Sequence, residues 1–96
     1  MNQDTIGYYG QAWMSFMEEN HPKLVAQMQK RGTFEAVARS VNQSACDYCD
    51  LLNRQYALQN PPPDGPEAYR SWKKTRDYYI DSAVMRERVL VAVTRA

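Results

Sequence analysis

Three consecutive prolines, Pro61–Pro63, constrain the fold of this chain more than any other feature. Proline has no backbone N–H and its ring clashes with the preceding helical turn, so a helix cannot run through them. They belong to the segment 60–66, Asn-Pro-Pro-Pro-Asp-Gly-Pro, which we expect to be a stiff, extended connection. Long apolar stripes of helical periodicity lie on both sides of it. The segment therefore predicts a turn between two long helices rather than a boundary between domains.

The stripe before the prolines predicts a helix over residues 34–59. Phe34, Val41 and Tyr48 recur every seven residues. A second row, offset by four positions, consists of Ala38, Ala45 and Leu52. Thr33 precedes the first apolar residue and is a residue type that favours the N-cap.

The stripe after the prolines predicts a helix over residues 66–94. Asp64 is a candidate acidic cap, and Pro66 and Glu67 are start signals for the first turn. The positions of this stripe are Tyr69, Trp72, Arg76, Tyr79, Ile80, Ala83, Leu90 and Val91. Two helices of similar length joined by a short loop are expected to pack antiparallel, as a hairpin.

The first third of the chain predicts two short helices, over about residues 5–20 and 22–31. Pro22 disfavours helical geometry at His21, so the first helix should end there, and Pro22 suits the first position of the second helix. Gly32 follows as a C-cap that can adopt left-handed geometry. The candidate N-caps of the first helix are Asp4 and Thr5.

No segment shows the alternation of β-branched and polar residues that is typical of a strand. The chain has 96 residues, of which 44% are apolar, which is enough for one domain and too little for two. We therefore expect a single all-α domain over residues 1–96. Its architecture should be a small helical bundle in which two short N-terminal helices pack on a long antiparallel hairpin.

Catalytic and metal sites are poorly supported by the composition. The chain has one histidine, His21, and two cysteines, Cys46 and Cys49, spaced as C-x-x-C. A structural zinc site needs four ligands, and no second cysteine or histidine pair is present. Both cysteines lie inside a predicted helix, where no free N–H groups lower a thiol pKa. We expect no catalytic residues, no metal and no cofactor, and a thiol or metal function of the pair remains a third-ranked hypothesis.

The chain has no apolar run near the roughly 20 residues that a membrane helix needs. The start, residues 1–6, lacks a basic region followed by an apolar stretch, so no signal peptide is predicted. We therefore expect a cytoplasmic protein that makes no use of a membrane.

Positive charge is concentrated in residues 69–76, although the net charge of the chain is only +1. The basic residues are Arg70, Lys73, Lys74 and Arg76. Tyr69 and Trp72 lie between them, a mixture that can hold phosphate and stack on bases. The alternative is a solvated helix face whose potential is reduced by Asp77 and Asp81 one turn later.

Binding of a protein or nucleoprotein partner is the leading functional hypothesis. Eleven aromatic residues and five methionines suit an adhesive surface. Large apolar residues at or beyond the edges of their stripes are candidates for it, namely Tyr8, Met14, Tyr56 and Tyr78. A homodimer is also possible, because Val37, Leu51 and Leu58 form an extra apolar flank on one helix.

The first 35 residues resemble the TnpV family, small transposon-encoded proteins of Gram-positive bacteria and their phages. The residues that carry the resemblance are Ile6-Gly7-Tyr8-Tyr9-Gly10, Trp13, Phe16, Glu19-Asn20-His21-Pro22, Leu24, Met28 and Gly32. The chain departs from the family pattern at Gln11 and Ala12, where basic residues are usual, and in its triple-proline loop.

The resemblance implies a helical accessory protein of a mobile genetic element and implies no particular chemistry. Such elements encode small inhibitors of host defence, including anti-CRISPR proteins, and small DNA-binding accessories. We therefore expect stoichiometric, non-enzymatic binding of a protein or nucleoprotein, with an anti-CRISPR-type inhibitor as one specific form. The alternative is a small nucleic-acid-binding protein that uses the Arg70–Arg76 face.

Overall fold

The computed structural model describes residues 6–91, and this part of the chain is helical with no strand. The elements are α1 (Tyr8–Asn20), α2 (Pro22–Arg31), α3 (Phe34–Gln59), α4 (Pro66–Val84) and a π-helical turn, η1 (Met85–Val89). The all-α prediction is confirmed. The prolines act as expected, because Pro22 and Pro66 each open a helix and Pro61–Pro63 lie outside any helix.

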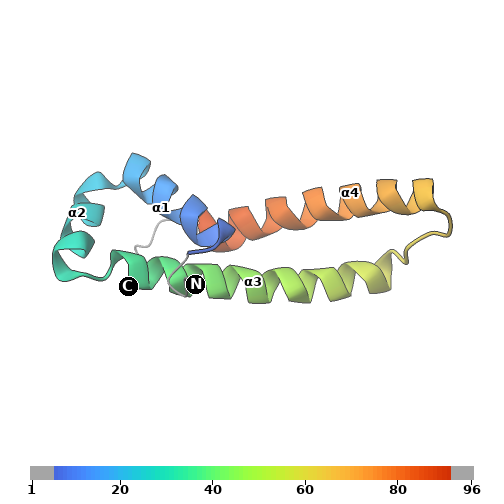
Figure 1. Cartoon of the computed structure of the whole chain (residues 1–96), viewed down its shortest axis with the longest axis horizontal. Helices are drawn as coiled ribbons and strands as arrows, with labels where there is room; N and C mark the ends of the chain where they lie inside the picture. The colour runs from blue at the N-terminus through green and yellow to red at the C-terminus, as the bar shows by residue number, and fades with distance from the viewer. Residues whose placement is uncertain (1–5, 92–96) are drawn as a thin grey trace.

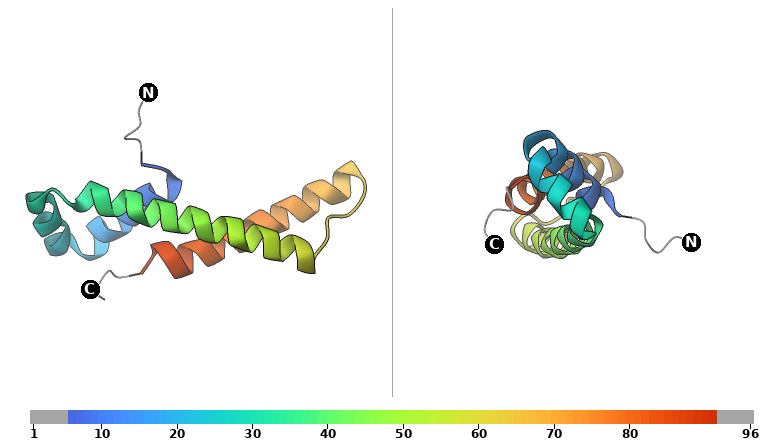
Figure 2. Two further views of the ribbon diagram at one scale, coloured as in Figure 1. Left: turned by 90° about the horizontal axis from the view of Figure 1, so that it is seen from below. Right: turned by 90° about the vertical axis from the view of Figure 1, so that its left-hand side faces the viewer.

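The molecule is elongated along α3. Figure 1 shows α4 returning antiparallel to α3, with α1 and α2 gathered at the end of α3 that is far from the proline loop. Figure 2 shows that α4 crosses α3 obliquely. The dimensions are 53 × 32 × 19 Å and the radius of gyration is 16.3 Å. A compact domain of this length would have a radius of gyration of about 12 Å, so part of the hairpin projects from the packed body.

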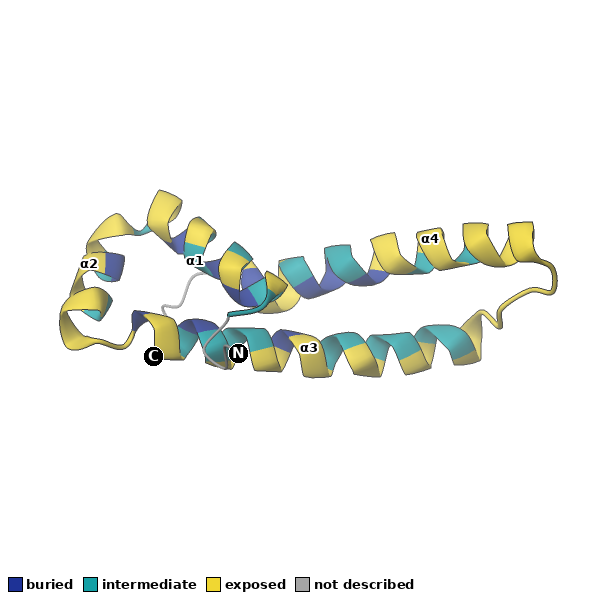
Figure 3. Ribbon diagram, in the orientation of Figure 1, coloured by how far each residue is buried: buried dark blue, intermediate teal, exposed yellow. Residues whose placement is uncertain are grey.

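Burial divides the molecule into two regions (Figure 3). The buried apolar side chains are Trp13, Met17, Val25, Phe34, Ala38, Ala45, Ile80, Ala83, Val84 and Val89. No residue in the range 46–79 is buried. We call residues 46–79 the arm, and residues 6–45 and 80–91 the base. The base contains the hydrophobic core, and the arm is a two-helix projection from it.

Gly10 explains how closely α1 approaches α3. Gly10 is buried, and its backbone N–H donates to the Asn42 side-chain oxygen (3.0 Å). A β-carbon at Gly10 would lie 2.8 Å from the backbone oxygen of Ala38. A helical glycine that costs about 1 kcal/mol in intrinsic propensity is thus used here for close packing of two helices.

Glycines stand at two N-caps for which the sequence offered other residues, although α4 begins at Pro66 as predicted. The first helix begins at Tyr8 with Gly7 as its N-cap, whereas the candidate caps Asp4 and Thr5 lie outside the described residues. The N-cap of α4 is Gly65 rather than Asp64. Gly65 has a φ of 94°, a left-handed conformation that disfavours residues with a β-carbon.

The two capping predictions around Gly32 have different outcomes. Gly32 ends α2 in left-handed geometry (φ 74°), as predicted. Thr33 is the N-cap of α3, but its side chain makes no capping bond. Its hydroxyl instead donates to the Met28 carbonyl oxygen (3.3 Å), so it serves the end of α2.

The predicted continuous helix to Thr94 is also wrong within the described residues. The α-helix ends at Val84 and passes into η1, in which Leu90 N–H bonds to the Met85 carbonyl (2.7 Å). A π-turn contains an additional residue, which shifts the phase of the apolar stripe. Val89 is therefore fully buried, whereas Leu90 and Val91, both predicted to be in the stripe, are exposed. Thr94 lies outside the described residues.

Candidate functional site

The arm presents three of the four predicted basic residues to solvent. Arg70, Lys73 and Lys74 are exposed on the outer face of α4. The two aspartates expected to reduce their potential are engaged elsewhere. Asp77 pairs with Arg76 (2.9 Å), and Asp81 accepts a hydrogen bond from the Tyr9 hydroxyl (3.3 Å). The structure therefore leaves a local positive surface on α4.

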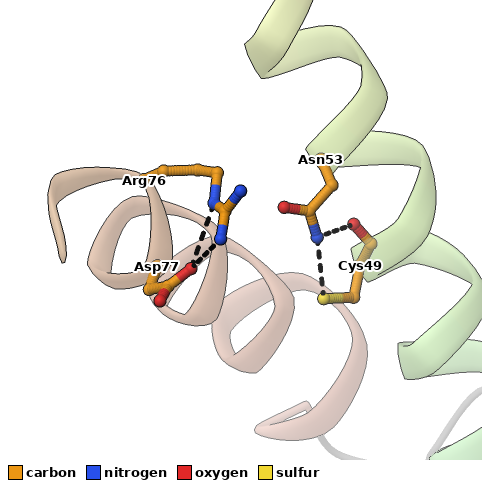
Figure 4. A network of polar contacts seen from close by, with 4 residues as sticks. All are labelled: Cys49, Asn53, Arg76 and Asp77. Atoms are coloured by element: carbon orange, nitrogen blue, oxygen red, sulfur yellow. Dashed lines mark hydrogen bonds and ion pairs between the residues drawn. The ribbon is translucent and has the colours of Figure 1, made fainter. Parts of the chain in front are cut away.

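Arg76 does not belong to that surface. Its guanidinium lies 5.0 Å from the centre of the Trp72 ring and binds the Asp77 carboxylate through two nitrogens. Figure 4 shows this pair on α4 facing Asn53 and Cys49 on α3. Only a fifth of the Arg76 side chain is exposed. The guanidinium thus packs on its own helix, on the side of α4 that faces α3, so the prediction that placed it with Arg70, Lys73 and Lys74 combined two different surfaces.

Aromatic rings hold the arm together without burying any of its residues. Tyr56 on α3 lies 5.8 Å from both Trp72 and Tyr79 on α4, measured between ring centres. The indole N–H of Trp72 donates to the Asn60 carbonyl (2.8 Å), which ties the start of the proline loop to α4. Tyr56 and Trp72 are therefore packing groups of the arm, and neither presents a whole ring face for stacking on a base.

The other two candidate tyrosines are exposed in different regions. Tyr8 is 64% exposed and lies on α1 in the base, whereas Tyr78 is 77% exposed and lies on α4 in the arm. Tyr8 packs edge-to-face on Tyr9, at 5.0 Å between ring centres. Burial, and the nearby Cys49 and Asp81, raise the pKa of Tyr9, so it acts as a neutral hydroxyl donor to Asp81.

The cysteine pair forms no metal site with the described residues. Cys46 is exposed and Cys49 is half-buried, and both thiols are free. Asn53 donates to the Cys49 carbonyl (3.0 Å) and lies 3.5 Å from its sulfur (Figure 4). Partial desolvation of its sulfur, together with the nearby Cys49, Asp50 and Asp47, raises the pKa of the Cys46 thiol, which disfavours the thiolate that nucleophilic or metal chemistry requires. Within residues 6–91 no three His, Cys, Asp or Glu side chains are grouped to hold a metal.

His21 connects α1 to α2. It is the C-cap of α1, where its backbone N–H bonds to the Met17 carbonyl (2.7 Å), and it also precedes Pro22 at the N-cap of α2. Its ring packs edge-on against Phe16, at 6.0 Å between ring centres. These contacts support the structural role of His21 that its position before a proline predicts.

Two shallow hollows on α3 were not anticipated from the sequence. The basal hollow is lined by Ser44, Asp47, Tyr48, Leu51 and, from η1, Arg88. The distal hollow is lined by Leu52, Gln55, Tyr56, Gln59, Asn60 and, from α4, Tyr79. Leu51, which lines the basal hollow, is an exposed apolar residue, but each hollow also needs a side chain from η1 or α4.

A tyrosine–carboxylate contact joins the arm to the base. The Tyr48 hydroxyl donates to the Glu87 carboxylate (2.5 Å), and the Arg88 guanidinium lies over the Tyr48 ring at 4.3 Å. The hydrogen bond to Glu87 raises the pKa of Tyr48 and lowers the pKa of Glu87. Glu87 thus pairs across the bundle, from η1 to α3.

Comparisons with known proteins identify no relative of this chain: no known protein family, no curated protein and no solved structure matches it. Among residues 6–91, no helix is long and apolar enough to cross a membrane. The arguments below therefore depend on the geometry of the chain itself.

Proposed function

We propose that this chain is a non-enzymatic accessory protein that binds a protein or nucleoprotein partner stoichiometrically, through the arm. One observation carries the proposal. The arm is regular two-helix structure, yet none of its residues is buried, and it exposes Leu58, Tyr69, Tyr78 and Tyr79. An element that adds no core and presents large apolar groups is better explained by binding than by stability.

The chemistry of the outer face of α4 favours an acidic partner surface. Arg70, Lys73 and Lys74 supply positive charge, and Tyr78 adds an exposed ring on the same helix. Arginine and tyrosine are enriched at the energetic centres of interfaces, whereas charges at the rim mainly accelerate encounter. We define Arg70, Lys73, Lys74 and Tyr78 as the α4 face.

The biological setting that we propose is a mobile genetic element, with the protein acting in the cytoplasm of the host cell. It rests on the resemblance of the first 35 residues to TnpV proteins. In its most specific form the proposal is an anti-CRISPR-type inhibitor that binds a CRISPR effector. A nuclease-protection assay with purified effectors tests that form, and cleavage unchanged by an excess of the protein would exclude it for each effector tested.

The general proposal is tested by capture of partners from the native host. The wild-type chain and the Lys73→Glu, Lys74→Glu double variant are immobilised and the retained proteins are compared. We expect a partner that the wild type retains and the variant loses. The matched control reverses the charge of two exposed lysines in α2, through Lys23→Glu and Lys30→Glu, and should retain the partner. Equal retention by all three chains would contradict a role for the α4 face.

Nucleic-acid binding is the alternative function, supported by the same three exposed cations. It predicts affinity for DNA or RNA at low salt that falls steeply as salt increases, because bound counterions are released. Lys73→Glu, Lys74→Glu should abolish that binding. Absence of binding at low salt would exclude this alternative, and loss of the captured partner after nuclease treatment would favour it over a direct protein contact.

A further inference from the structure

We infer that Cys46 and Cys49 form a site of reversible oxidation, at which a low-molecular-weight disulfide converts the two thiols into one intramolecular disulfide. The site lies in the first turn of the arm, immediately beyond Ala45, where the buried positions of α3 end. The inference gives a specific chemistry to the thiol hypothesis that the C-x-x-C spacing raises. It concerns residues outside the α4 face and does not depend on the proposed function.

The two thiols differ in exposure in the way that a stepwise reaction needs. Cys46 is exposed, so an oxidant in solution can reach its sulfur. Cys49 is half-buried and lines a hollow of about 190 Å³ together with Tyr9 and Asp81. An accessible cysteine beside a second thiol is the arrangement of redox-responsive pairs, in which the second thiol resolves the adduct formed on the first.

The helix places the two cysteines at a distance that a disulfide can bridge. Residues three apart in an α-helix have Cα atoms about 5 Å apart, within the range of about 4.4–6.8 Å found in disulfides. Their β-carbons lie about 5–6 Å apart, whereas a disulfide brings them to about 3.5–4.5 Å. Closing the bond therefore requires a local distortion of α3 at residues 46–49. No residue of this turn is buried, so the distortion displaces no core side chain.

Oxidised glutathione is the disulfide that we choose as the probe, and its reaction has two exchange steps. The Cys46 thiolate attacks one glutathione sulfur, which forms a mixed disulfide and releases one reduced glutathione. The Cys49 thiolate then attacks the Cys46 sulfur, which closes the intramolecular disulfide and releases the second reduced glutathione. The protein dithiol is oxidised, the glutathione disulfide is reduced, and the two thiol protons end on the released glutathione molecules.

The raised pKa of the Cys46 thiol affects the rate of the first step and not its outcome. Partial desolvation, with the nearby Cys49, Asp50 and Asp47, keeps most of this thiol protonated at neutral pH. A thiol of higher pKa is a stronger nucleophile once it is ionised, so exchange proceeds, at a reduced rate. The site therefore suits a sustained oxidising condition rather than a brief pulse of peroxide.

Each sulfur also takes part in a polar contact of α3. The Asn42 side-chain nitrogen donates to the Cys46 sulfur (3.8 Å), and the oxygen of the same amide accepts the Gly10 N–H (3.0 Å). The Asn53 side-chain nitrogen lies 3.5 Å from the Cys49 sulfur (Figure 4). A disulfide draws the two sulfurs toward each other and away from these amides. Oxidation therefore loosens Asn42, and with it the contact between α1 and α3 at Gly10.

Intact-mass measurement of the reduced chain after incubation with oxidised glutathione in mildly alkaline buffer tests the site. We expect the wild type to lose two hydrogen atoms in mass and to keep no glutathione, and dithiothreitol to reverse the change. Cys49→Ser has no resolving thiol, so it should retain one glutathione on Cys46. A wild type that keeps a glutathione adduct, forms a disulfide-linked dimer or stays fully reduced would overturn the inference.

Amide hydrogen exchange on the reduced and the oxidised chain tests the coupling to α1. Gly10 lies in the first turn of α1, where backbone N–H groups have no partner within the helix, so its exchange reports directly on Asn42. Oxidation should accelerate exchange severalfold at Gly10 and in residues 42–53. The double variant Cys46→Ser, Cys49→Ser, treated with the same oxidant, is the matched control and should not change. Unchanged exchange at Gly10 in the oxidised wild type would overturn the coupling.

Discussion

The base and the arm are made of the same kind of helix and are held together in different ways. In the base, α1, α2, η1 and the start of α3 enclose fully buried side chains such as Trp13, Met17 and Val84. In the arm, α3 and α4 continue as regular helices with no buried residue between positions 46 and 79. They are joined by the ring contacts of Tyr56 and by the hydrogen bond from Trp72 to the Asn60 carbonyl. Burial provides the stability of the base, whereas the arm keeps its surface available for partners.

The comparison predicts that removing a core ring from the base unfolds the whole molecule. Trp13 is fully buried and packs on Phe34 at 5.4 Å between ring centres. Trp13→Ala should lower the free energy of unfolding by about 3–5 kcal/mol, because it creates a cavity in the core of the base. Chemical denaturation followed by circular dichroism measures this. Trp13→Phe should cost less, because the buried indole N–H has no hydrogen-bond partner among the described residues.

The second prediction concerns the contact between α1 and α3. Gly10→Ala should destabilise the fold by about 1–3 kcal/mol, since the added methyl group meets the Ala38 backbone oxygen, which cannot move away as a side chain can. Ser15→Ala, at an exposed position of the same helix, is the control and should be neutral or slightly stabilising. Equal stability of the two variants would show that α1 packs less closely than the structure indicates.

The third prediction separates the arm from the base. Trp72→Phe removes the hydrogen bond to the Asn60 carbonyl and should cost about 1 kcal/mol. The loss should be local, so amide hydrogen exchange should accelerate in residues 50–79 and remain unchanged around Trp13 and Ala38. A similar acceleration in the base would mean that the two regions open as one unit.

The smallest effect is expected at Tyr48, where the arm meets the base. The Tyr48 hydroxyl lowers the pKa of Glu87 in the folded state. This contribution to stability is complete above the ordinary carboxyl pKa and is lost as the pH falls through the lowered pKa of the folded state. Tyr48→Phe should therefore reduce stability at neutral pH and flatten its decline in acid. Thermal unfolding from neutral to acidic pH checks this, with Tyr78→Phe as a control that keeps the slope of the wild type.

Local chemistry explains which parts of the fold could be predicted. Pro22 and Pro61–Pro63 limit helices wherever they occur, and Gly32 adopts a left-handed conformation that other residues avoid. The end of α4 could not be predicted in the same way. Its π-turn rotates the apolar stripe relative to a regular α-helix. A constant period of 3.6 residues, which the sequence pattern assumes, would place Leu90 in the core, whereas the structure buries Val89 and exposes Leu90.

The sequence pointed to the basic residues of the candidate surface, and the structure changes the position of one of them. The segment 69–76 contains the exposed cations Arg70, Lys73 and Lys74, but Arg76 turns inward to Trp72 and Asp77. Spacing on a helix shows which residues share a side, and it does not show which partner a long side chain chooses. The hollows on α3 depend on side chains from α4 and η1, so no pattern within one helix could reveal them.

The sequence by itself determined that this chain is helical and where most of its helices begin and end, because proline and glycine act through their own backbone geometry. Only the tertiary structure decided that the core stops at Ala45 and Ile80. That limit depends on how far α1, α2 and η1 reach along α3, since a stripe is buried only where another element covers it. The same apolar pattern therefore forms a core in the base and an accessible surface in the arm.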